Sequence, residues 1–135
     1  MVNVVLVSHS AKLAEGLAEL VRQMAQGCQV ATAAGVDDPE HPIGTDAVKI
    51  MQAIESVYSE SGVVILVDLG SAILSAETAI DLLEPEQAQH VVICYAPLVE
   101  GAMAAVVSAS GGDDLATVIA EANAAAGLKL QQAEK

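Results

Sequence analysis

The chain has 135 residues, of which 53% are hydrophobic, and its five basic and 18 acidic residues give a net charge of −13 at pH 7. A single domain of this length buries about two-thirds of its unfolded surface without disulfides or a structural metal. The negative charge repels nucleic acid and anionic lipid. The two aromatic residues, Tyr58 and Tyr95, are too few for a platform on which bases stack. These properties exclude nucleic acid as a partner.

The chain also lacks the usual signals for membrane insertion and export. No apolar run reaches the roughly 18 residues that a membrane span requires. The N-terminal residues lack the basic segment and the small-residue cleavage site of a signal peptide, so we expect them to form a strand. The sequence therefore predicts one soluble domain over residues 1–135, located in the cytoplasm and not inserted in a membrane.

Short runs of β-forming residues alternate with helical patterns along the chain. The runs are continuously apolar, which is typical of parallel strands covered on both faces. They span residues 2–7, 29–33, 63–68 and 90–96. Between them, apolar side chains recur with the spacing of amphipathic helices. The stripes that these side chains form extend over residues 13–24, 47–58 and 73–83.

Two further helices are indicated by the residues at their ends. Pro97 suits the first turn of a fourth helix, which runs toward Ser110 and is ended by the glycine pair 111–112. Asp113 or Asp114 then caps a fifth helix. The buried face of this fifth helix is expected to comprise Leu115, Val118, Ile119, Ala122 and Ala126.

Strands that alternate with helices predict an α/β domain with a parallel sheet and right-handed crossovers. We expect a three-layer sandwich in which a four-stranded parallel sheet, with strand order 2-1-3-4, is covered by about five helices. Residues 1–127 should form the folded core, and residues 128–135 a frayed tail. The helical segment 102–108 is apolar on more than one face, which suggests a homodimer.

Three segments leave the strands of the predicted sheet at their carboxyl ends, where ligands bind in open α/β domains. These segments are Ser8-His9-Ser10, residues 68–71 and residues 96–101. In the order 2-1-3-4, the direction of the strand order reverses between the first and the third strand. We therefore expect His9 and Asp68 to be neighbours at this switch point.

A pair formed by His9 and Asp68 suits nucleophilic chemistry. A carboxylate that accepts from one imidazole nitrogen selects the tautomer and makes the other nitrogen nucleophilic, and it stabilises the charge that develops during attack. The N–H groups at two helix starts, together with Gly70 and the hydroxyls of Ser8, Ser10 and Ser71, suit a phosphoryl group. The residues alone also allow a simpler interpretation, in which His9 only ends a strand and Ser10 only caps a helix.

Other potentially reactive residues have structural interpretations. Cys28 and Cys94 form no metal-binding pattern and are expected to be buried. His41 follows the acidic segment 37–40, where a metal site is a minor alternative to a solvated loop. His90 is expected on the surface at the opposite end of the sheet. Because the usual nucleotide-binding and serine-hydrolase motifs are also missing, we expect neither a metal nor a cofactor.

Several segments of the sequence resemble one known family. They are Val5-Leu-Val-Ser-His-Ser followed by Leu13-Ala-Glu-Gly, Ile43-Gly-Thr leading into Ile50, Leu66-Val-Asp-Leu-Gly-Ser-Ala, and Ala96-Pro-Leu-Val-Glu-Gly-Ala. Over residues 2–126, the chain is similar to the phosphotransferase (M) subunits of phosphoenolpyruvate-dependent dihydroxyacetone kinases. These subunits are in turn similar to the IIA domains of mannose-type sugar phosphotransferase systems.

The resemblance implies a role for specific residues and partners. His9 matches the phosphorylated histidine, Asp68 matches the carboxylate that orients it, and Ser71 falls at the helix start that faces it. The implied phosphoryl donor is the histidine-phosphorylated carrier HPr. The implied acceptor is ADP on the L subunit of the kinase, which phosphorylates dihydroxyacetone held by the K subunit. Some M subunits carry further HPr-like and enzyme-I-like domains; since this sequence ends at Lys135, we expect it to depend on separate carriers.

Two other functions stay open on the sequence alone. The IIA domain of a mannose-type sugar permease would use the same chemistry, but such domains carry Gly-Gly-Ser-Pro where this chain has Leu69-Gly-Ser-Ala. A non-catalytic regulatory module on the same fold is the second alternative. In a receiver-type module, Asp68 would accept the phosphoryl group, but such modules need an acidic pair after the first strand, where this chain has Ser8-His9-Ser10.

Overall fold

The computed structural model describes residues 1–134 and contains the predicted parallel sheet. Its strands are β1 (Asn3–Ser8), β2 (Val30–Ala34), β3 (Val63–Val67) and β4 (Val91–Cys94). They pair in the order β2-β1-β3-β4, which confirms the predicted strand order. Val7 of β1 lies opposite Ala33 of β2 and Val67 of β3. The carboxyl ends of these three strands therefore meet at one edge of the sheet.

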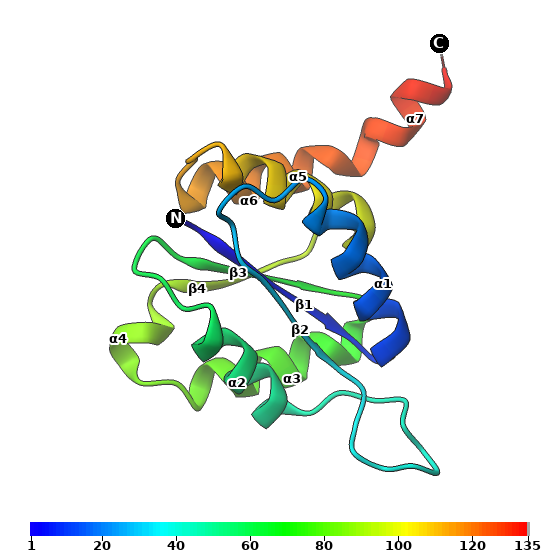
Figure 1. Cartoon of the computed structure of the whole chain (residues 1–135), viewed down its shortest axis with the longest axis vertical. Helices are drawn as coiled ribbons and strands as arrows, with labels where there is room; N and C mark the ends of the chain where they lie inside the picture. The colour runs from blue at the N-terminus through cyan, green and yellow to red at the C-terminus, as the bar shows by residue number, and fades with distance from the viewer. Residues whose placement is uncertain (135) are drawn as a thin grey trace.

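Two layers of helices cover the sheet, which confirms the three-layer architecture (Figure 1). One face carries α1 (Ala11–Arg22), α5 (Leu98–Ser110) and α6 (Leu115–Ala124). The other face carries α2 (Ala47–Ser56) and α3 (Gly70–Asp81). The short helix α4 (Pro85–Ala88) precedes β4, and the 3-10 turn η1 (Ala125–Gly127) leads from α6 into α7 (Leu128–Ala133).

The alternation of side chains along the strands divides the core into two halves. Val4 and Leu6 of β1 pack with the helices on one face, whereas Val5 and Val7 pack with those on the other. All four side chains are buried. Because successive residues of a strand point to opposite faces, a strand covered on both sides must be apolar at every position. This requirement explains why the strands are unbroken apolar runs in the sequence.

The helix ends follow from local hydrogen bonds. Asp114 caps α6, since its Oδ1 accepts from the N–H of Thr117 (2.9 Å), whereas Asp113 accepts from the hydroxyl of Ser108 (2.7 Å). The fourth predicted helix begins at Leu98, with Pro97 as its N-cap residue. Within residues 1–134, none of the helices is long and apolar enough to cross a membrane.

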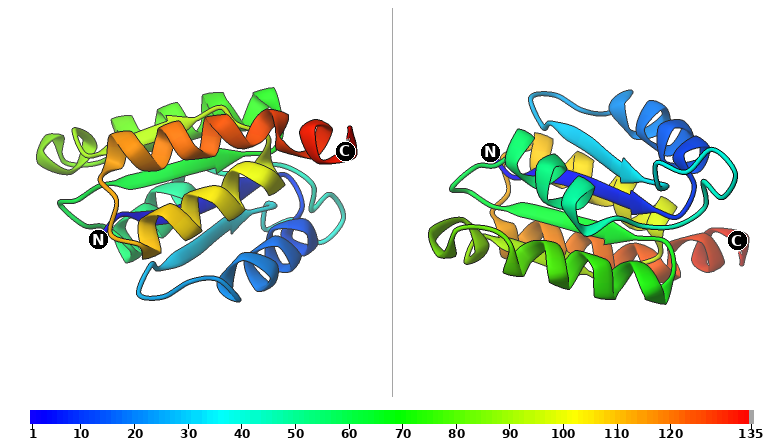
Figure 2. Two further views of the ribbon diagram at one scale, coloured as in Figure 1. Left: turned by 90° about the horizontal axis from the view of Figure 1, so that it is seen from above. Right: turned by 90° about the horizontal axis from the view of Figure 1, so that it is seen from below.

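Two short helices were not expected from the sequence. One is α4, and the other is α7, which occupies residues 128–133 of the expected frayed tail and contains no buried residue. Lys129 of α7 forms an ion pair with Glu100 of α5 (2.9 Å). The N-terminus lies at the amino ends of the strands (Figure 2), and α7 projects from its helical layer away from the sheet (Figure 1). Lys135 lies outside the described residues.

Helix α5 packs so closely on the sheet that Gly101 has no room for a side chain. A Cβ atom there would lie 2.8 Å from Cβ of Ala96 and 3.0 Å from Cδ2 of Leu66.

We predict that Gly101→Ala lowers the free energy of unfolding by about 1–3 kcal/mol, because overpacking outweighs the gain in helix propensity. Gly16 of α1 is the matched control, since a Cβ there would meet no heavy atom within 4 Å. Gly16→Ala should raise the free energy of unfolding by roughly 0.5–1 kcal/mol. Urea unfolding measures both changes, and equal effects would contradict the packing argument.

Candidate functional site

The candidate site lies where β1 and β3 end side by side. Because Val7 and Val67 are paired across these two strands, the residues that follow them leave the sheet next to each other. The chain after β1 enters α1 on one face, and the chain after β3 enters α3 on the other face. His9 and Asp68 therefore lie together at the switch point, as the strand order predicts.

Asp68 holds His9 through both its ring and its backbone. Oδ1 of Asp68 lies 2.9 Å from Nδ1 of His9, and Oδ2 accepts from the backbone N–H of His9, also at 2.9 Å. Because a carboxylate can only accept, Nδ1 carries the proton in this contact. The other ring nitrogen, Nε2, is then left with its lone pair, which is the form of imidazole that acts as a nucleophile.

The carboxylate of Asp68 is held in its ionised form by several donors. Besides the two contacts from His9, it accepts from the hydroxyl of Ser8 (2.9 Å) and from the backbone N–H of Leu69 (2.7 Å). Burial raises the pKa of Asp68, but the hydrogen bonds from His9, Ser8 and Leu69 outweigh burial and bring the pKa below its ordinary value. A full negative charge therefore stands beside the imidazole.

Ser71 approaches the other side of the imidazole from the first turn of α3. Its Oγ lies 2.5 Å from Nε2 of His9, so its hydroxyl donates to the free lone pair. No side chain caps α3, and its N-cap residue is Leu69. A Cβ at Gly70 would meet no heavy atom within 4 Å, so this glycine leaves open space and is not required for close packing. The backbone at the start of α3 is therefore accessible next to Nε2.

Ser8 and Ser10 have partners within the protein, which changes their expected role. Ser8 is buried at the end of β1, donates to Asp68 and accepts from the N–H of Ser10 (3.1 Å). Oγ of Ser10 accepts from the N–H of Leu13 (3.3 Å) and so caps α1. The two hydroxyls that we expected to face a phosphoryl group thus serve the Asp68 carboxylate and the helix start.

Gly44 contacts His9 and was not identified by the analysis of strand ends. Its N–H donates to the carbonyl of His9 (2.9 Å) from the loop between β2 and α2. Because this loop follows an edge strand, its position over the site could not be derived from the strand pattern. The Ile43-Gly-Thr motif was the only signal in the sequence that pointed to this segment.

The other polar candidates lie apart from His9 or are already paired. Asp37 forms an ion pair with Lys49 (2.7 Å), and Asp38 accepts from the N–H groups of Glu40 and His41 within the loop. The ring of His90 lies 6.5 Å from that of Tyr58, centroid to centroid. No cluster of three or more His, Cys, Asp or Glu suitable for a metal occurs in the part of the chain that the structure describes.

The two cysteines occupy buried positions, as expected. Burial raises the pKa of the Cys28 thiol to about 11, so this thiol stays protonated at neutral pH. Cys94 lies at the end of β4, where its thiol donates to Oδ1 of Asn123 (3.6 Å). Both residues therefore act as small core residues.

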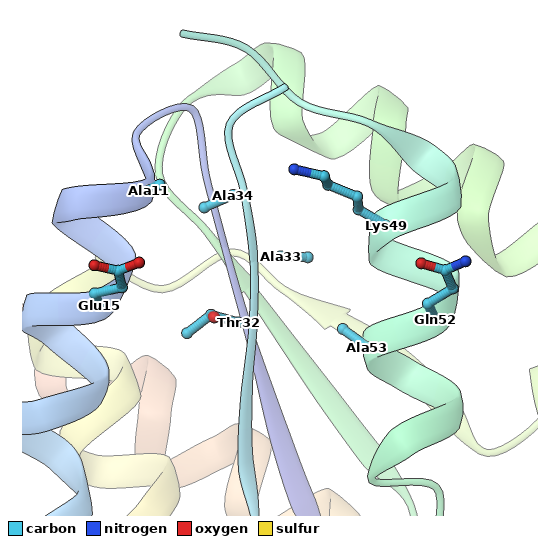
Figure 3. Close-up of a pocket in the computed structure, with 8 residues that line it drawn as sticks. All are labelled: Ala11, Glu15, Thr32, Ala33, Ala34, Lys49, Gln52 and Ala53. Atoms are coloured by element: carbon cyan, nitrogen blue, oxygen red, sulfur yellow. The ribbon is translucent and has the colours of Figure 1, made fainter. Parts of the chain in front are cut away.

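A hollow of about 390 Å³ lies away from His9, along the outer edge of β2 (Figure 3). Its walls are Glu15 of α1 and Lys49 and Gln52 of α2, and Thr32 lies on its floor. The small side chains of β2 leave this space open between the two helices. Lys49 is paired with Asp37, so the polar groups of this hollow do not converge on a common point. We therefore place the candidate functional site at His9.

Comparison with known proteins identifies the family of the chain. A family model described as "PTS system fructose IIA component" (EIIA-man) matches residues 3–119. The chain belongs to this family. Within it, the chain groups with the phosphoryl donor subunits DhaM of phosphoenolpyruvate-dependent dihydroxyacetone kinases, which confirms the resemblance noted in the sequence.

Two curated DhaM relatives and one solved structure define the extent of the similarity. The DhaM of Escherichia coli K12 is 56% identical over 98% of this chain, which spans only 28% of that relative. A Listeria innocua DhaM is 42% identical over 79% of this chain, which covers 85% of that relative. The crystal structure of unknown function protein EF1359 has a TM-score of 0.78 and 38% identity, covering 90% of this chain and 92% of that one.

The lowered pKa of Asp68 predicts how its contribution to stability depends on pH. The carboxylate stabilises the fold fully above the ordinary pKa of 3.8, and this stabilisation is lost as the pH falls through the lower pKa of the folded state. Asp68→Asn should lower the free energy of unfolding at pH 7 by roughly 1.5–3 kcal/mol, because hydrogen bonds to a charged group are lost. The difference in the free energy of unfolding between Asp68→Asn and the unmodified protein should shrink as the pH falls below 3.8.

Urea unfolding at a series of pH values measures this difference. The control is Glu77→Gln, which changes an exposed acidic residue of α3 and should run parallel to the unmodified protein. A gap between Asp68→Asn and the unmodified protein that stays constant down to the acid limit would refute the prediction.

Proposed function

We propose that this chain carries a phosphoryl group on Nε2 of His9 and delivers it within a phosphoenolpyruvate-dependent dihydroxyacetone kinase. The proposal depends on one observation: Asp68 binds both Nδ1 and the backbone N–H of His9, which leaves Nε2 toward the exposed hydroxyl of Ser71. The relatives from Escherichia coli and Listeria innocua are named as phosphoryl donor subunits of such kinases, which supports the same role here.

In the loading step, the lone pair on Nε2 attacks the phosphorus of a phosphohistidine on the donor. An N–P bond forms at His9 while the donor's N–P bond breaks, and the bonding electrons return to the donor's imidazole. The proton on Nδ1 stays in its hydrogen bond to Asp68, whose charge balances that of the phosphorylated ring. Because Oγ of Ser71 lies 2.5 Å from Nε2, this hydroxyl must rotate away, after which it can donate to a phosphoryl oxygen.

In the delivery step, a β-phosphate oxygen of ADP attacks the phosphorus on His9. A P–O bond forms, the N–P bond breaks, and its electrons return to Nε2, so that ADP becomes ATP. Such transfers depend mainly on positioning and on stabilisation of charge. We propose HPr as the donor and ADP bound to the kinase L subunit as the acceptor, and we expect the exchange to take place in the cytoplasm.

The surface around the site supports docking of a protein rather than a small molecule. Large apolar side chains that are between 63% and 68% exposed lie on the segments next to His9 and Asp68. They are Ile43, Leu69, Leu74 and Tyr95. Ile43 precedes Gly44, Leu69 follows Asp68, and Leu74 precedes Ser75. Tyr95 lines a shallow hollow of about 260 Å³ beside Asp68. A partner protein with an apolar contact area would cover these four side chains. Basic residues around that area would be attracted to this chain, because its net charge is −13.

We predict that His9 alone is phosphorylated. The protein and the variants His9→Ala, His41→Ala and His90→Ala are incubated with enzyme I, HPr and labelled phosphoenolpyruvate. Only His9→Ala should lose the label, because the other two histidines lie outside the Asp68 site. Circular dichroism verifies that each variant is folded. Label retained by a folded His9→Ala protein would refute the assignment.

The labelled protein then identifies the acceptor. Label should pass rapidly to ADP bound to a cognate L subunit, and free ADP, free dihydroxyacetone and a mannose-type IIB domain should stay unlabelled. This selectivity follows because the acceptor oxygen must be brought in line with the phosphorus. Rapid transfer to the IIB domain, with none to L-bound ADP, would instead indicate a IIA domain of a sugar permease.

We also propose that the chain forms a homodimer through α5. One side of α5 packs on the sheet through Ala105 and Val106, while Val99, Met103 and Val107 form a stripe on the outer side. With Leu20 of α1 and Leu128 of α7, this stripe borders an apolar groove of about 570 Å³. A second copy of the chain would remove these side chains from water.

We predict a dimer by light scattering at tens of micromolar protein. Val107→Lys should shift the protein to a monomer, because a charge would be buried at the contact. Glu77→Lys introduces the same side chain on the opposite face of the molecule, on α3, and should leave the dimer intact. A monomeric unmodified protein at this concentration would overturn the proposal.

A further inference from the structure

The loop between β2 and α2, residues 35–46, rests on the backbone of the proposed nucleophile. At the start of this loop, the N–H of Gly35 donates to the carbonyl of Ser8 (3.2 Å), and near its end the N–H of Gly44 donates to the carbonyl of His9 (2.9 Å). The backbone of Gly44 has φ +156°, a region that favours glycine. The loop thus touches His9 through a residue that has no side chain with which to hold itself in place.

A contact between two hydroxyl groups fixes the loop next to that hydrogen bond. Oγ1 of Thr45 lies 2.6 Å from Oγ of Ser75 on α3, and both residues are half-buried. Ser75 follows Ser71 by one helical turn, so the two hydroxyls lie on the same side of α3. The helix therefore presents one hydroxyl to the imidazole of His9 and the next to the loop that holds the His9 carbonyl.

These contacts hold His9 at four of its atoms. Asp68 binds the backbone N–H and Nδ1, Ser71 binds Nε2, and Gly44 binds the carbonyl oxygen. The first three contacts come from the end of β3 and the start of α3, which are rigidly joined to each other. The fourth comes from a loop without regular secondary structure, and it needs a separate anchor.

We propose that Thr45 and Ser75 are positioning residues that hold Gly44 against the His9 carbonyl and so aim Nε2 at the incoming phosphorus. This inference rests on the proposed function of His9. When the hydroxyl contact is lost, Gly44 can move away, and the peptide that follows His9 keeps only the hydrogen bond from the N–H of Ser10 to the hydroxyl of Ser8. The imidazole then samples orientations in which Nε2 is not in line with the phosphorus, and small misplacements of reacting atoms slow such transfers strongly.

The experiment compares variants that remove one hydroxyl with little change in shape. Thr45→Val and Ser75→Ala should each lower the rate of His9 phosphorylation at saturating phospho-HPr by about tenfold, with the KM for phospho-HPr changed by less than about twofold. The double variant should be no slower than the slower single variant, because the two hydroxyls act as one contact. Thr45→Ser keeps the hydroxyl and should restore the rate to near that of the unmodified protein.

The matched control is Thr78→Val on the same helix. The hydroxyl of Thr78 donates only to the carbonyl of Leu74 in its own helix (2.9 Å), so its loss should leave the phosphorylation rate unchanged. Urea unfolding of every variant separates a loss of folded protein from a loss of rate. An equal loss of rate in Thr78→Val and Thr45→Val would contradict a specific role for the loop contact.

A second measurement tests the same contact without any phosphoryl transfer. The ¹⁵N signals of the His9 imidazole in the unphosphorylated protein report which ring nitrogen carries the proton and how well Nε2 is hydrogen-bonded. These signals should move in Thr45→Val and Ser75→Ala and return in Thr45→Ser. Imidazole signals that stay unchanged in both variants would overturn the inference.

The two measurements also separate this inference from the proposed function. If the unmodified protein accepts no phosphoryl group, the proposed function fails, and the imidazole signals alone then decide whether Thr45 and Ser75 position His9. If the unmodified protein is phosphorylated at His9 while Thr45→Val keeps the full rate, only the positioning role is refuted.

Discussion

The carboxylate of Asp68 is the group on which the arrangement of the site depends. It accepts hydrogen bonds from the hydroxyl of Ser8, from the backbone and ring of His9 and from the backbone of Leu69. These donors come from the ends of β1 and β3, so a single charge joins the two central strands at the point where their helices diverge. The same charge determines which nitrogen of His9 bears the proton, and this couples local folding to reactivity.

Because Asp68 binds His9 through Nδ1, the other ring nitrogen, Nε2, stays accessible although much of the histidine is covered. The side chains of His9 and Asp68 are 18% and 13% exposed, so their contact is shielded from water and its electrostatic effect is strong. The buried side of the ring is used for orientation, and the open side faces the start of α3. The proposed function needs both properties, because Nε2 must be aimed and must also be reached by a donor and by an acceptor.

Much of the fold could be predicted because strands covered on both faces must be apolar throughout. The runs around Val5 and Ile65 carry that signal clearly, and the strand order placed His9 next to Asp68. The short helices α4 and α7 were missed because each is too short to show a helical period. Helix α7 also buries none of its residues, so no apolar stripe marks it in the sequence.

The details of the site were harder to predict because they depend on the direction of individual side chains. β1 continues one residue further than expected, which turns Ser8 inward to Asp68 and leaves Ser71 as the hydroxyl at Nε2. The contact between Thr45 and Ser75 joins a loop to a helix 30 residues away in sequence. No periodic pattern encodes such a contact, because it is set by tertiary packing alone.

The direction of α7 has a consequence for how a partner could be attached to this protein. Its ion pair between Lys129 and Glu100 anchors it to α5, and it projects away from the sheet (Figure 1). A domain fused after α7 would therefore begin away from the sheet edge that bears His9, and one fused before β1 would begin roughly 20 Å from that edge, at the other end of the strands. A fused phosphoryl donor would then need a flexible tether that spans this gap, and its effective concentration at Nε2 would be highest when the length of the tether matches the span.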